Sequence, residues 1–373
     1  MRRAWLVIGL ASGASTVQAA PWIVTAEGGA EADSNVQRVE TGPGLPTSAS
    51  SAAALRLGGR VDHRDQLLDG AYSFALSGLA RIVGDPKITT ENITLFSGDL
   101  RWMRPIGSRP VAIGVAITAA DVVALTGGNG ARAFSNLGAD IVLAVRSGED
   151  RHLTLAIGGR DFRYKPAPAY DWSGPVASAR LDLMLWQPSG KTKSLELAAT
   201  AGFEARTYGS NALANACAID EPIDPTCFAP TSLVRRDRFE RASLELTWVG
   251  SFVGAIGYQL TVVDSNSFGQ SLTRHRATAS ATVSLPWSSF ATVLGTLQID
   301  RFTDGLIVQT DLQHSEFTSL DDENRSSVQF RVARAVTSTW SLEGRAAAWR
   351  DLGGNTSSNF QRSLVYLGAI YTH

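Results

Sequence analysis

The strongest constraint on the fold is the alternation of side chains in the last stretch of the chain, from Arg362 to His373. Successive side chains of a β-strand point to opposite faces, so every second residue shares a face. One face of this stretch carries Val365, Leu367, Ala369 and Tyr371. The same form, an arginine followed by apolar residues three and five positions later, begins at Arg241, Arg276 and Arg325. The chain therefore repeats a hairpin unit and ends on a strand.

This ending resembles the C-terminal strand of bacterial outer-membrane β-barrels, in which alternate residues counted back from the C-terminus are apolar or aromatic and face lipid. Tyr371 fits the pattern, whereas His373 stands where that family usually ends in an aromatic residue. The resemblance implies an all-β, closed antiparallel transmembrane barrel in the outer membrane, inserted by the barrel-assembly machinery through its last strand. The alternative is the edge strand of a soluble β-sandwich.

The first nineteen residues have the organisation of a secretory signal peptide. Arg2 and Arg3 precede an apolar run from Ala4 to Ala11, and small residues end the segment. The run is too short to span a bilayer. We therefore predict a signal peptide over residues 1–19 and a single barrel domain over residues 20–373.

Composition narrows the membrane class further. Apolar residues make up 44% of the chain and the formal net charge is −1, yet no later segment has the unbroken apolar length of a membrane helix. A membrane protein without such helices must satisfy its backbone hydrogen bonds between strands, which requires a barrel. Basic residues are dispersed and balanced by acids, so we expect no nucleic-acid partner.

Short and long connections alternate along the chain, as in barrels with short periplasmic turns and longer extracellular loops. Counting strands back from the C-terminus gives about 16, an even number that leaves both termini periplasmic. The connection at Gly84 to Thr90 has a length that fits either side. The short connections are predicted at Asp65–Gly70, Arg104–Pro110, Ser147–Arg151, Pro188–Lys193, Val249–Ser251, Pro286–Ser289 and Val336–Thr339.

Charged residues recur on the face opposite the apolar one, which a water-filled lumen accepts. Both signs occur, so the lumen should be hydrated without a strong preference for anions or cations. The alternative is that these residues pair with one another and hold the wall together. The candidate set is Glu27, Arg56, Arg60, Asp62, Arg81, Asp99, Arg101, Asp140, Arg160, Arg180, Asp182, Glu196, Glu204, Arg206, Glu245, Arg331, Glu343 and Arg345.

Aromatic residues gather at the ends of the predicted strands, as expected for a girdle at a membrane interface. The proposed periplasmic girdle comprises Trp102, Trp248, Trp287 and Trp340. Trp186 lies at the same height, but its phase in the strand pattern places it on the inner face.

Cys217 and Cys227 lie in one polar connection, Gly209 to Arg238. Outside the cytoplasm such a close pair favours a disulfide. No ligand set around them indicates a metal. A disulfide-held loop here is the best candidate for one that folds into the lumen.

A second charge repeat lies at the predicted outer rim, with aspartates ending outgoing strands and arginines opening returning ones. We expect opposite charges to meet across the rim of one hairpin. They would close the hairpin and contact lipopolysaccharide, or line a vestibule for a polyanion or sugar chain. The residues are Asp33, Asp264, Asp300 and Asp351 with Arg241, Arg276, Arg325 and Arg362.

Catalytic motifs are weak in this sequence. His314, Ser315 and Glu316 are the only adjoining base, hydroxyl and carboxylate, but neighbours on a strand point to opposite faces and do not form a triad. No Gly-x-Ser-x-Gly elbow or phosphate-binding glycine loop is present. We predict no enzymatic activity and no cofactor.

The predicted function is a transmembrane conduit, either a diffusion pore or the exit of an export system. The segment Asp33 to Val36 and the strands headed by arginine resemble barrels of surface lipoprotein assembly modifiers and polysaccharide secretion machines. That resemblance implies a periplasmic export partner. The competing classes are a non-conducting surface barrel, which acts through its loops and contacts outer-membrane lipid and lipopolysaccharide, and an outer-membrane enzyme.

Overall fold

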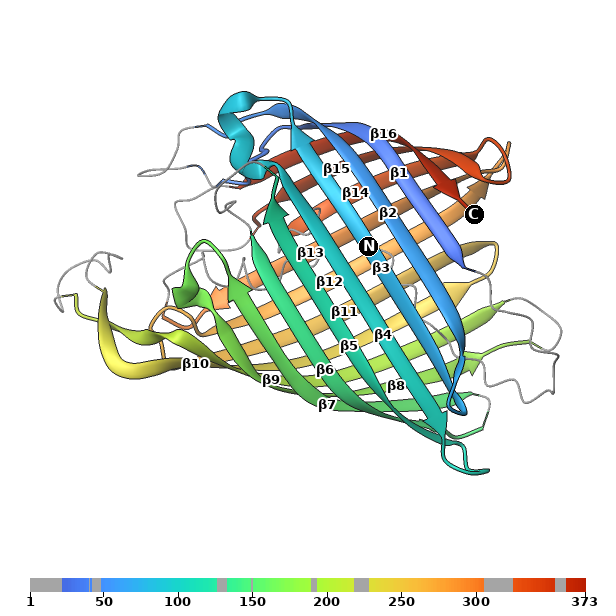
Figure 1. Ribbon diagram of the computed structural model, residues 1–373, viewed down its shortest axis with the longest axis horizontal. Coiled ribbons are helices and arrows are strands. Elements are labelled where there is room, and N and C mark those ends of the chain that lie inside the picture. The colour runs from blue at the N-terminus through green and yellow to red at the C-terminus, as the bar shows by residue number, and fades with distance from the viewer. Residues whose placement is uncertain are drawn as a thin grey trace.

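The computed structural model of the chain is a closed antiparallel β-barrel, shown in Figure 1. Each strand pairs with its neighbours in sequence, and β1 pairs with β16 to close the ring. The structure describes residues 22–39, 41, 48–125, 133–148, 150–188, 193–217, 228–304, 325–352 and 360–373. The prediction of an all-β barrel of about 16 strands is confirmed, because the sheet contains 16. The predicted signal peptide lies outside the described residues and stays a prediction.

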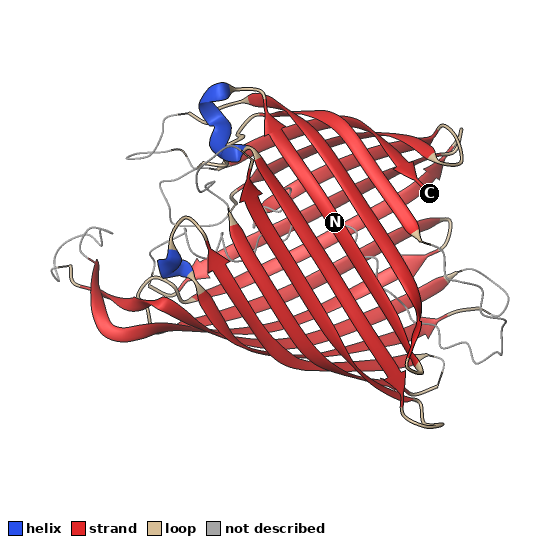
Figure 2. Cartoon of the chain, viewed as in Figure 1, coloured by secondary structure: helices blue, strands red, loops and turns tan. Residues whose placement is uncertain are grey.

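The strands are β1 (Ile23–Asp33), β2 (Ala52–Leu67), β3 (Gly70–Val83), β4 (Ile93–Pro105), β5 (Val111–Ala124), β6 (Phe134–Arg146), β7 (Arg151–Tyr164), β8 (Trp172–Trp186), β9 (Ser194–Asn215), β10 (Phe228–Val249), β11 (Phe252–Ser265), β12 (Leu272–Leu285), β13 (Ser289–Phe302), β14 (Ser326–Ala335), β15 (Trp340–Arg350) and β16 (Gln361–Thr372). Two 3₁₀ helices, η1 (Pro86–Glu91) and η2 (Pro168–Tyr170), lie in connections (Figure 2). In the described residues no helix has both the length and the apolar character to cross a bilayer.

The C-terminal strand closes the barrel, as its resemblance to the last strand of outer-membrane barrels implied. Its register with β1 runs from Thr25 opposite Thr372 to Asp33 opposite Leu364. His373 extends the ladder, since its N–H donates to Val24 O and Val24 N–H donates to His373 O, both at 2.9 Å. The His373 ring lies parallel to that of Tyr371, with centroids 6.4 Å apart. An imidazole therefore occupies the aromatic end position.

Connection lengths separate the two ends of the barrel. One end of the barrel, which we call the short-turn end, has the connections 68–69, 106–110, 147–150, 187–193, 250–251, 286–288 and 336–339. The first of these is a two-residue hairpin turn in which Leu68 and Asp69 both have positive φ, 53° and 57°, the conformation that matches the twist of paired strands. The remaining connections form the long-loop end. The segment from Gly84 belongs there, and η1 fills most of it.

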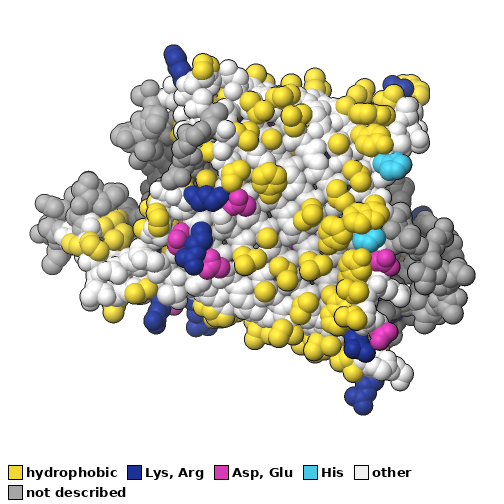
Figure 3. All heavy atoms as spheres, in the orientation of Figure 1, with side chains coloured by type: hydrophobic (Ala, Val, Ile, Leu, Met, Phe, Trp, Pro, Cys, Tyr) yellow, Lys and Arg dark blue, Asp and Glu magenta, His cyan; other side chains and the backbone are white. Residues whose placement is uncertain are grey.

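The outer wall is apolar at alternate positions. In β16 the side chains of Val365 and Leu367 are 53% and 67% exposed, whereas Tyr366 between them is 1% exposed. Figure 3 shows hydrophobic side chains spread over the wall between the two ends. An exposed apolar surface of this kind is stable where lipid covers it.

The described residues of the segment from Gly209 to Arg238 are nearly all strand, so the connection is shorter than its sequence bounds. Residues 218–227, where an inward loop would lie, are outside the described residues, and the inward fold stays a prediction. Here β9 continues to Asn215 and β10 begins at Phe228, so the two strands extend the wall as a hairpin (Figure 1). The neighbouring strand β8 does not reach as far toward the long-loop end. It begins at Trp172, which pairs with Tyr208, whereas β9 continues beyond that pair. The Cys217 N–H donates to Asn215 Oδ1 at 3.0 Å. Cys227 lies outside the described residues, so the disulfide stays a prediction.

The four girdle tryptophans all lie at the short-turn end, which is the arrangement that their sequence positions predict. Trp287 sits in a turn and is 80% exposed. The Trp340 ring packs against Tyr371 with centroids 5.2 Å apart. The Trp102 Nε1–H donates to Leu67 O at 2.9 Å. Their contact with a membrane interface stays a prediction.

Trp186 lies on the outer face, so its sequence assignment to the inner face is wrong. The register between β8 and β9 shifts between Met184 and Trp186, which pairs Trp186 with Leu195. Leu195 pairs in turn with Trp248, and the two indole rings stack 5.6 Å apart with 9° between their planes. One extra residue in a strand moves the following side chain to the other face.

The assignment of outward and inward faces predicts that an arginine introduced at either of two adjacent residues will have different effects on stability. Leu244 is 56% exposed on the outer wall, and Ser243 has the opposite phase. We expect Leu244→Arg to destabilise the barrel by roughly 2–4 kcal/mol, because it places a charge in lipid. Ser243→Arg directs the same side chain into the lumen and should cost much less. Urea titration of the refolded variants in lipid vesicles measures both, and equal losses would contradict the faces.

Candidate functional site

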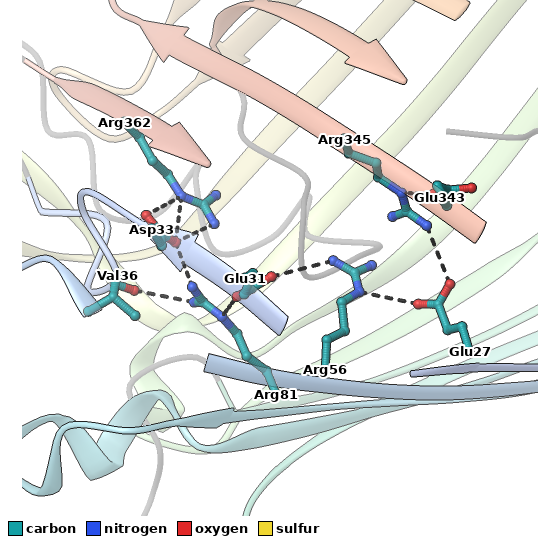
Figure 4. Close-up of polar contacts among 9 residues, drawn as sticks. All are labelled: Glu27, Glu31, Asp33, Val36, Arg56, Arg81, Glu343, Arg345 and Arg362. Atoms are coloured by element: carbon teal, nitrogen blue, oxygen red, sulfur yellow. Dashed lines mark hydrogen bonds and ion pairs between the residues drawn. The ribbon is translucent and has the colours of Figure 1, made fainter. Parts of the chain in front are cut away.

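A continuous chain of ion pairs lines the inner wall where the barrel closes (Figure 4). Arg56 contacts Glu27 at 3.2 Å and Glu31 at 3.9 Å. Glu31 also pairs with Arg81. The five arginines and four carboxylates of this chain, which we call the seam network, are in order Arg331, Glu343, Arg345, Glu27, Arg56, Glu31, Arg81, Asp33 and Arg362.

Asp33 and Glu27 join strands on the two sides of the closure. Asp33 Oδ2 lies 2.5 Å from Arg81 Nη2 on β3 and 2.7 Å from Arg362 Nη2 on β16. Glu27 Oε2 lies 3.3 Å from Arg345 Nη2 on β15. Because β1 and β16 are the two ends of the strand order, these carboxylates link the first strands of the chain to the last.

The register explains why acids alternate with arginines here. Arg56 and Arg81 are direct partners of the β2–β3 ladder, and like charges placed directly opposite repel. Glu31 on β1 contacts both guanidinium groups. The acid from the neighbouring strand therefore turns a repulsive pair into an alternating row.

Burial changes along the seam network. The side chains of Asp33 and Glu31 are 0–1% exposed, and those of Arg81 and Arg362 are 1–3% exposed. Charges this deeply buried are stable only when paired. Glu27, Arg331 and Arg345 are 20–25% exposed. Glu343, which lies between Arg331 and Arg345 in the network, is 0% exposed, so nearer the short-turn end only the two arginines and Glu27 reach the lumen.

Tyr366 lies beneath this network and was missed from the sequence. Its ring lies 4.9 Å from the Arg345 guanidinium carbon and 5.6 Å from that of Arg56. A Cβ at Gly368 would lie 2.1 Å from the Tyr366 hydroxyl, and one at Gly29 2.6 Å from the ring, so the phenol needs glycine at both positions. The sequence signal that could have identified Tyr366 was its position on the inward face of the last strand, next to inward-facing glycines.

A second cluster occupies the inner wall of β8 to β10. Glu204 contacts Arg206 at 2.6 Å and Arg241 at 2.8 Å. The Arg206 guanidinium lies between two rings, 4.3 Å from the centroid of Trp172 and 3.9 Å from that of Phe239. Each cation here is therefore held by both a carboxylate and aromatic faces.

The other predicted lumen residues form smaller pairs or stand apart. The pairs are Arg60–Asp62 at 2.6 Å, Arg160–Asp140 at 2.7 Å and Arg180–Asp182 at 2.7 Å. Glu196 accepts a hydrogen bond from Ser194 Oγ at 2.9 Å. Within the described residues Asp99, Arg101, Glu196 and Glu245 make no ion pair, so their charges are the least compensated of the candidate set.

The rim charges pair differently from the sequence expectation. Asp300 pairs with Arg274 at 2.8 Å rather than with Arg325 across its own loop, and Asp351 pairs with Arg325 at 3.0 Å rather than with Arg362. Asp264 lies on the outer face, where it is exposed. Both pairs join strands that are connected by a short turn, β12 with β13 and β14 with β15, instead of the two strands that flank one long loop.

Paired charges also lie on the outside of the wall toward the long-loop end, where Figure 3 shows charged side chains beside the apolar surface. Asp161 lies 2.7 Å from Arg163, and Asp121 lies 2.7 Å from Lys165. These side chains are 30–56% exposed. The segment His314 to Glu316 lies outside the described residues.

No protein-family model matches the chain, and no curated protein matches its sequence. Among solved structures it is similar to OmpT, an outer membrane protein of Vibrio cholerae, with a TM-score of 0.45 and 9% identity over 96% of this chain and 99% of that one. OccAB1 of Acinetobacter baumannii gives 0.45 and 10% identity over 95% and 96%. The TodX monoaromatic hydrocarbon channel gives 0.40 and 10% over 95% and 90%.

The seam network predicts a large penalty for losing its buried acid. Asp33→Ala removes the carboxylate that Arg81 and Arg362 share, and we expect a loss of about 3–5 kcal/mol in the free energy of unfolding. The control is Asp161→Ala, which removes an exposed acid paired with Arg163 and should cost about 0–1 kcal/mol. Urea titration in vesicles, followed by tryptophan fluorescence, measures both. Similar losses would show that the network contributes little.

Proposed function

We propose that the protein is a water-filled conduit across the bacterial outer membrane that acts as a diffusion pore. The observation that carries this proposal is a closed barrel with an apolar outer wall and a charged inner wall. Ion pairs on the inner face need hydration or mutual pairing, and the partly exposed end of the seam network has both.

In this proposal the short-turn end faces the periplasm and the long-loop end faces outward. The exposed pairs of Asp161 with Arg163 and Asp121 with Lys165 then lie at the level of lipopolysaccharide phosphates. The last strand engages the barrel-assembly machinery during insertion. If the conduit serves polysaccharide or surface export, it works with a periplasmic partner.

Single-channel recording in a planar bilayer tests the conduit. The refolded protein should give stable open steps. A correctly folded barrel that never conducts would overturn the diffusion pore and favour a non-conducting surface barrel. Conductance that begins only when a periplasmic fraction is added would favour the export role.

The uncompensated charges of the inner wall should set its weak ion preference. Asp99→Asn and Glu245→Gln should each lower the cation-to-anion permeability ratio by about twofold to fivefold, and Arg101→Gln should raise it. Unit charges a few ångströms apart in water interact by about 1 kcal/mol, which gives this magnitude. The reversal potential in a salt gradient measures the ratio. Asp161→Asn on the outer wall is the control and should leave it unchanged.

Cysteine labelling tests the orientation. In a background with Cys217 and Cys227 replaced by serine, Ser232→Cys lies in the β9–β10 hairpin and Ser338→Cys in a short turn. A membrane-impermeant maleimide applied to intact cells should label the first and not the second. The reverse pattern would invert the proposed topology.

A further inference from the structure

Three polar side chains meet across β2, β3 and β4 near the short-turn end, where these strands lie side by side (Figure 1). Arg64 on β2 is the direct ladder partner of Ser73 on β3, and Ser73 is the partner of Arg101 on β4. Leu67, three residues from Arg64, is 55% exposed on the outer wall, so Arg64 points inward, and direct partners in a ladder share its face. We call Arg64, Ser73 and Arg101 the basic row.

The basic row is accessible and has no partner within the described part of the chain. Arg64 is exposed, and Ser73 and Arg101 are half-buried, so part of each side chain faces the lumen. None of the three makes a side-chain hydrogen bond or an ion pair with the residues that the structure describes, and the buried Nε of Arg101 has no hydrogen-bond partner. The row therefore presents two uncompensated positive charges on either side of a hydroxyl.

The lack of an ion pair at Arg64 and Arg101 contrasts with the rest of the inner wall. Both oxygens of Asp62, two residues from Arg64, accept from Arg60 at 2.6 Å. Asp99 lies two residues from Arg101 and makes no ion pair in the described structure. In the other described strands an inward arginine two residues from an inward acid contacts that acid, as in Arg180–Asp182, Arg206–Glu204, Arg235–Asp237 and Arg345–Glu343.

We propose that the basic row binds a phosphate group carried by a solute on its way through the conduit. Residues that are partners of the same strand from its two sides lie about 10 Å apart, so the long arginine side chains can converge on one anion above the short Ser73. Each guanidinium donates two parallel hydrogen bonds to an oxyanion, and the serine hydroxyl donates one more.

Phosphate fits this donor set better than a carboxylate does. A phosphate group carries a charge of about −1.5 to −2 at pH 7 and has three or more acceptor oxygens, enough for two guanidinium groups and a hydroxyl. A carboxylate has one negative charge and two oxygens, which one arginine already satisfies. This inference rests on the proposed function and names the solute class that the inner wall retains.

The test is calorimetric titration of the refolded full-length barrel with inorganic phosphate, paired with recordings of chloride current to which phosphate is added. Phosphate should bind and lower the chloride current reversibly, and acetate should bind about tenfold more weakly. Arg64→Gln and Arg101→Gln each remove one cation and should weaken phosphate binding about tenfold, whereas Ser73→Ala should weaken it about threefold.

The matched control is Arg276→Gln on β12. Arg276 is also inward and half-buried and makes no ion pair with the described residues. Its direct ladder partners are Gln259 and Gln298, so no second arginine faces it across a strand. The variant removes the same charge from the lumen and should leave the phosphate affinity within about twofold of the wild type, because salt screens charges on distant walls.

Two outcomes would overturn the site. One is that phosphate does not bind. The other is that Arg276→Gln weakens binding as much as Arg64→Gln and Arg101→Gln do, because phosphate would then respond only to the net charge of the lumen. Calorimetry separates this inference from the proposed function: a barrel that conducts without binding phosphate retains only the conduit, and one that binds phosphate at the basic row without conducting retains only the site.

Discussion

The whole structure depends on hydrogen bonding between its first and last strands. In a bilayer no water satisfies a free strand edge, so a sheet is stable there only when it closes on itself. The ladder from Thr25 opposite Thr372 to Asp33 opposite Leu364 provides that closure. Asp33 and Glu27 reinforce it from the inside by contacting arginines on both sides of the joint. Backbone hydrogen bonds and side-chain ion pairs therefore stabilise the same junction between β1 and β16.

The closed wall divides into regions with different chemistry. The seam network is ionic, and its most deeply buried acids, Asp33 and Glu31, lie toward the long-loop end. The wall of β8 to β10 combines charge with aromatic rings, because the Arg206 guanidinium lies 4.3 Å from the Trp172 centroid and 3.9 Å from that of Phe239. This second region is therefore held by ion pairs and cation–π contacts together.

Most inner charges are paired with one another, which limits the ion selectivity that the proposed conduit would have. When a charge is already paired at 2.5–2.8 Å, as in Asp33 with Arg81 or Asp140 with Arg160, its partner largely cancels its electric field. Such a charge would act only weakly on a passing ion. Asp99, Arg101 and Glu245 are not compensated in this way within the described residues. The sequence interpretation left open whether the charged face was a pore lining or a wall-holding network. The structure pairs most of this set and leaves Asp99, Arg101, Glu196 and Glu245 without an ion pair among the described residues.

Local periodicity was enough to predict the strands and the turns between them, because the two-residue repeat and the turn residues are properties of neighbouring residues. Closure of the sheet followed instead from the resemblance of the last strand to those of outer-membrane barrels and from the need to satisfy backbone groups in lipid. Which side chains meet was decided by tertiary structure. Asp300 meets Arg274, and not Arg325 across its own loop, because the β12–β13 register places Asp300 opposite Arg274. One register shift at the end of β8 sends Trp186 outward, and β9 and β10 continue where the polar composition suggested a loop. Register joins residues far apart in the chain, so no local pattern contains it.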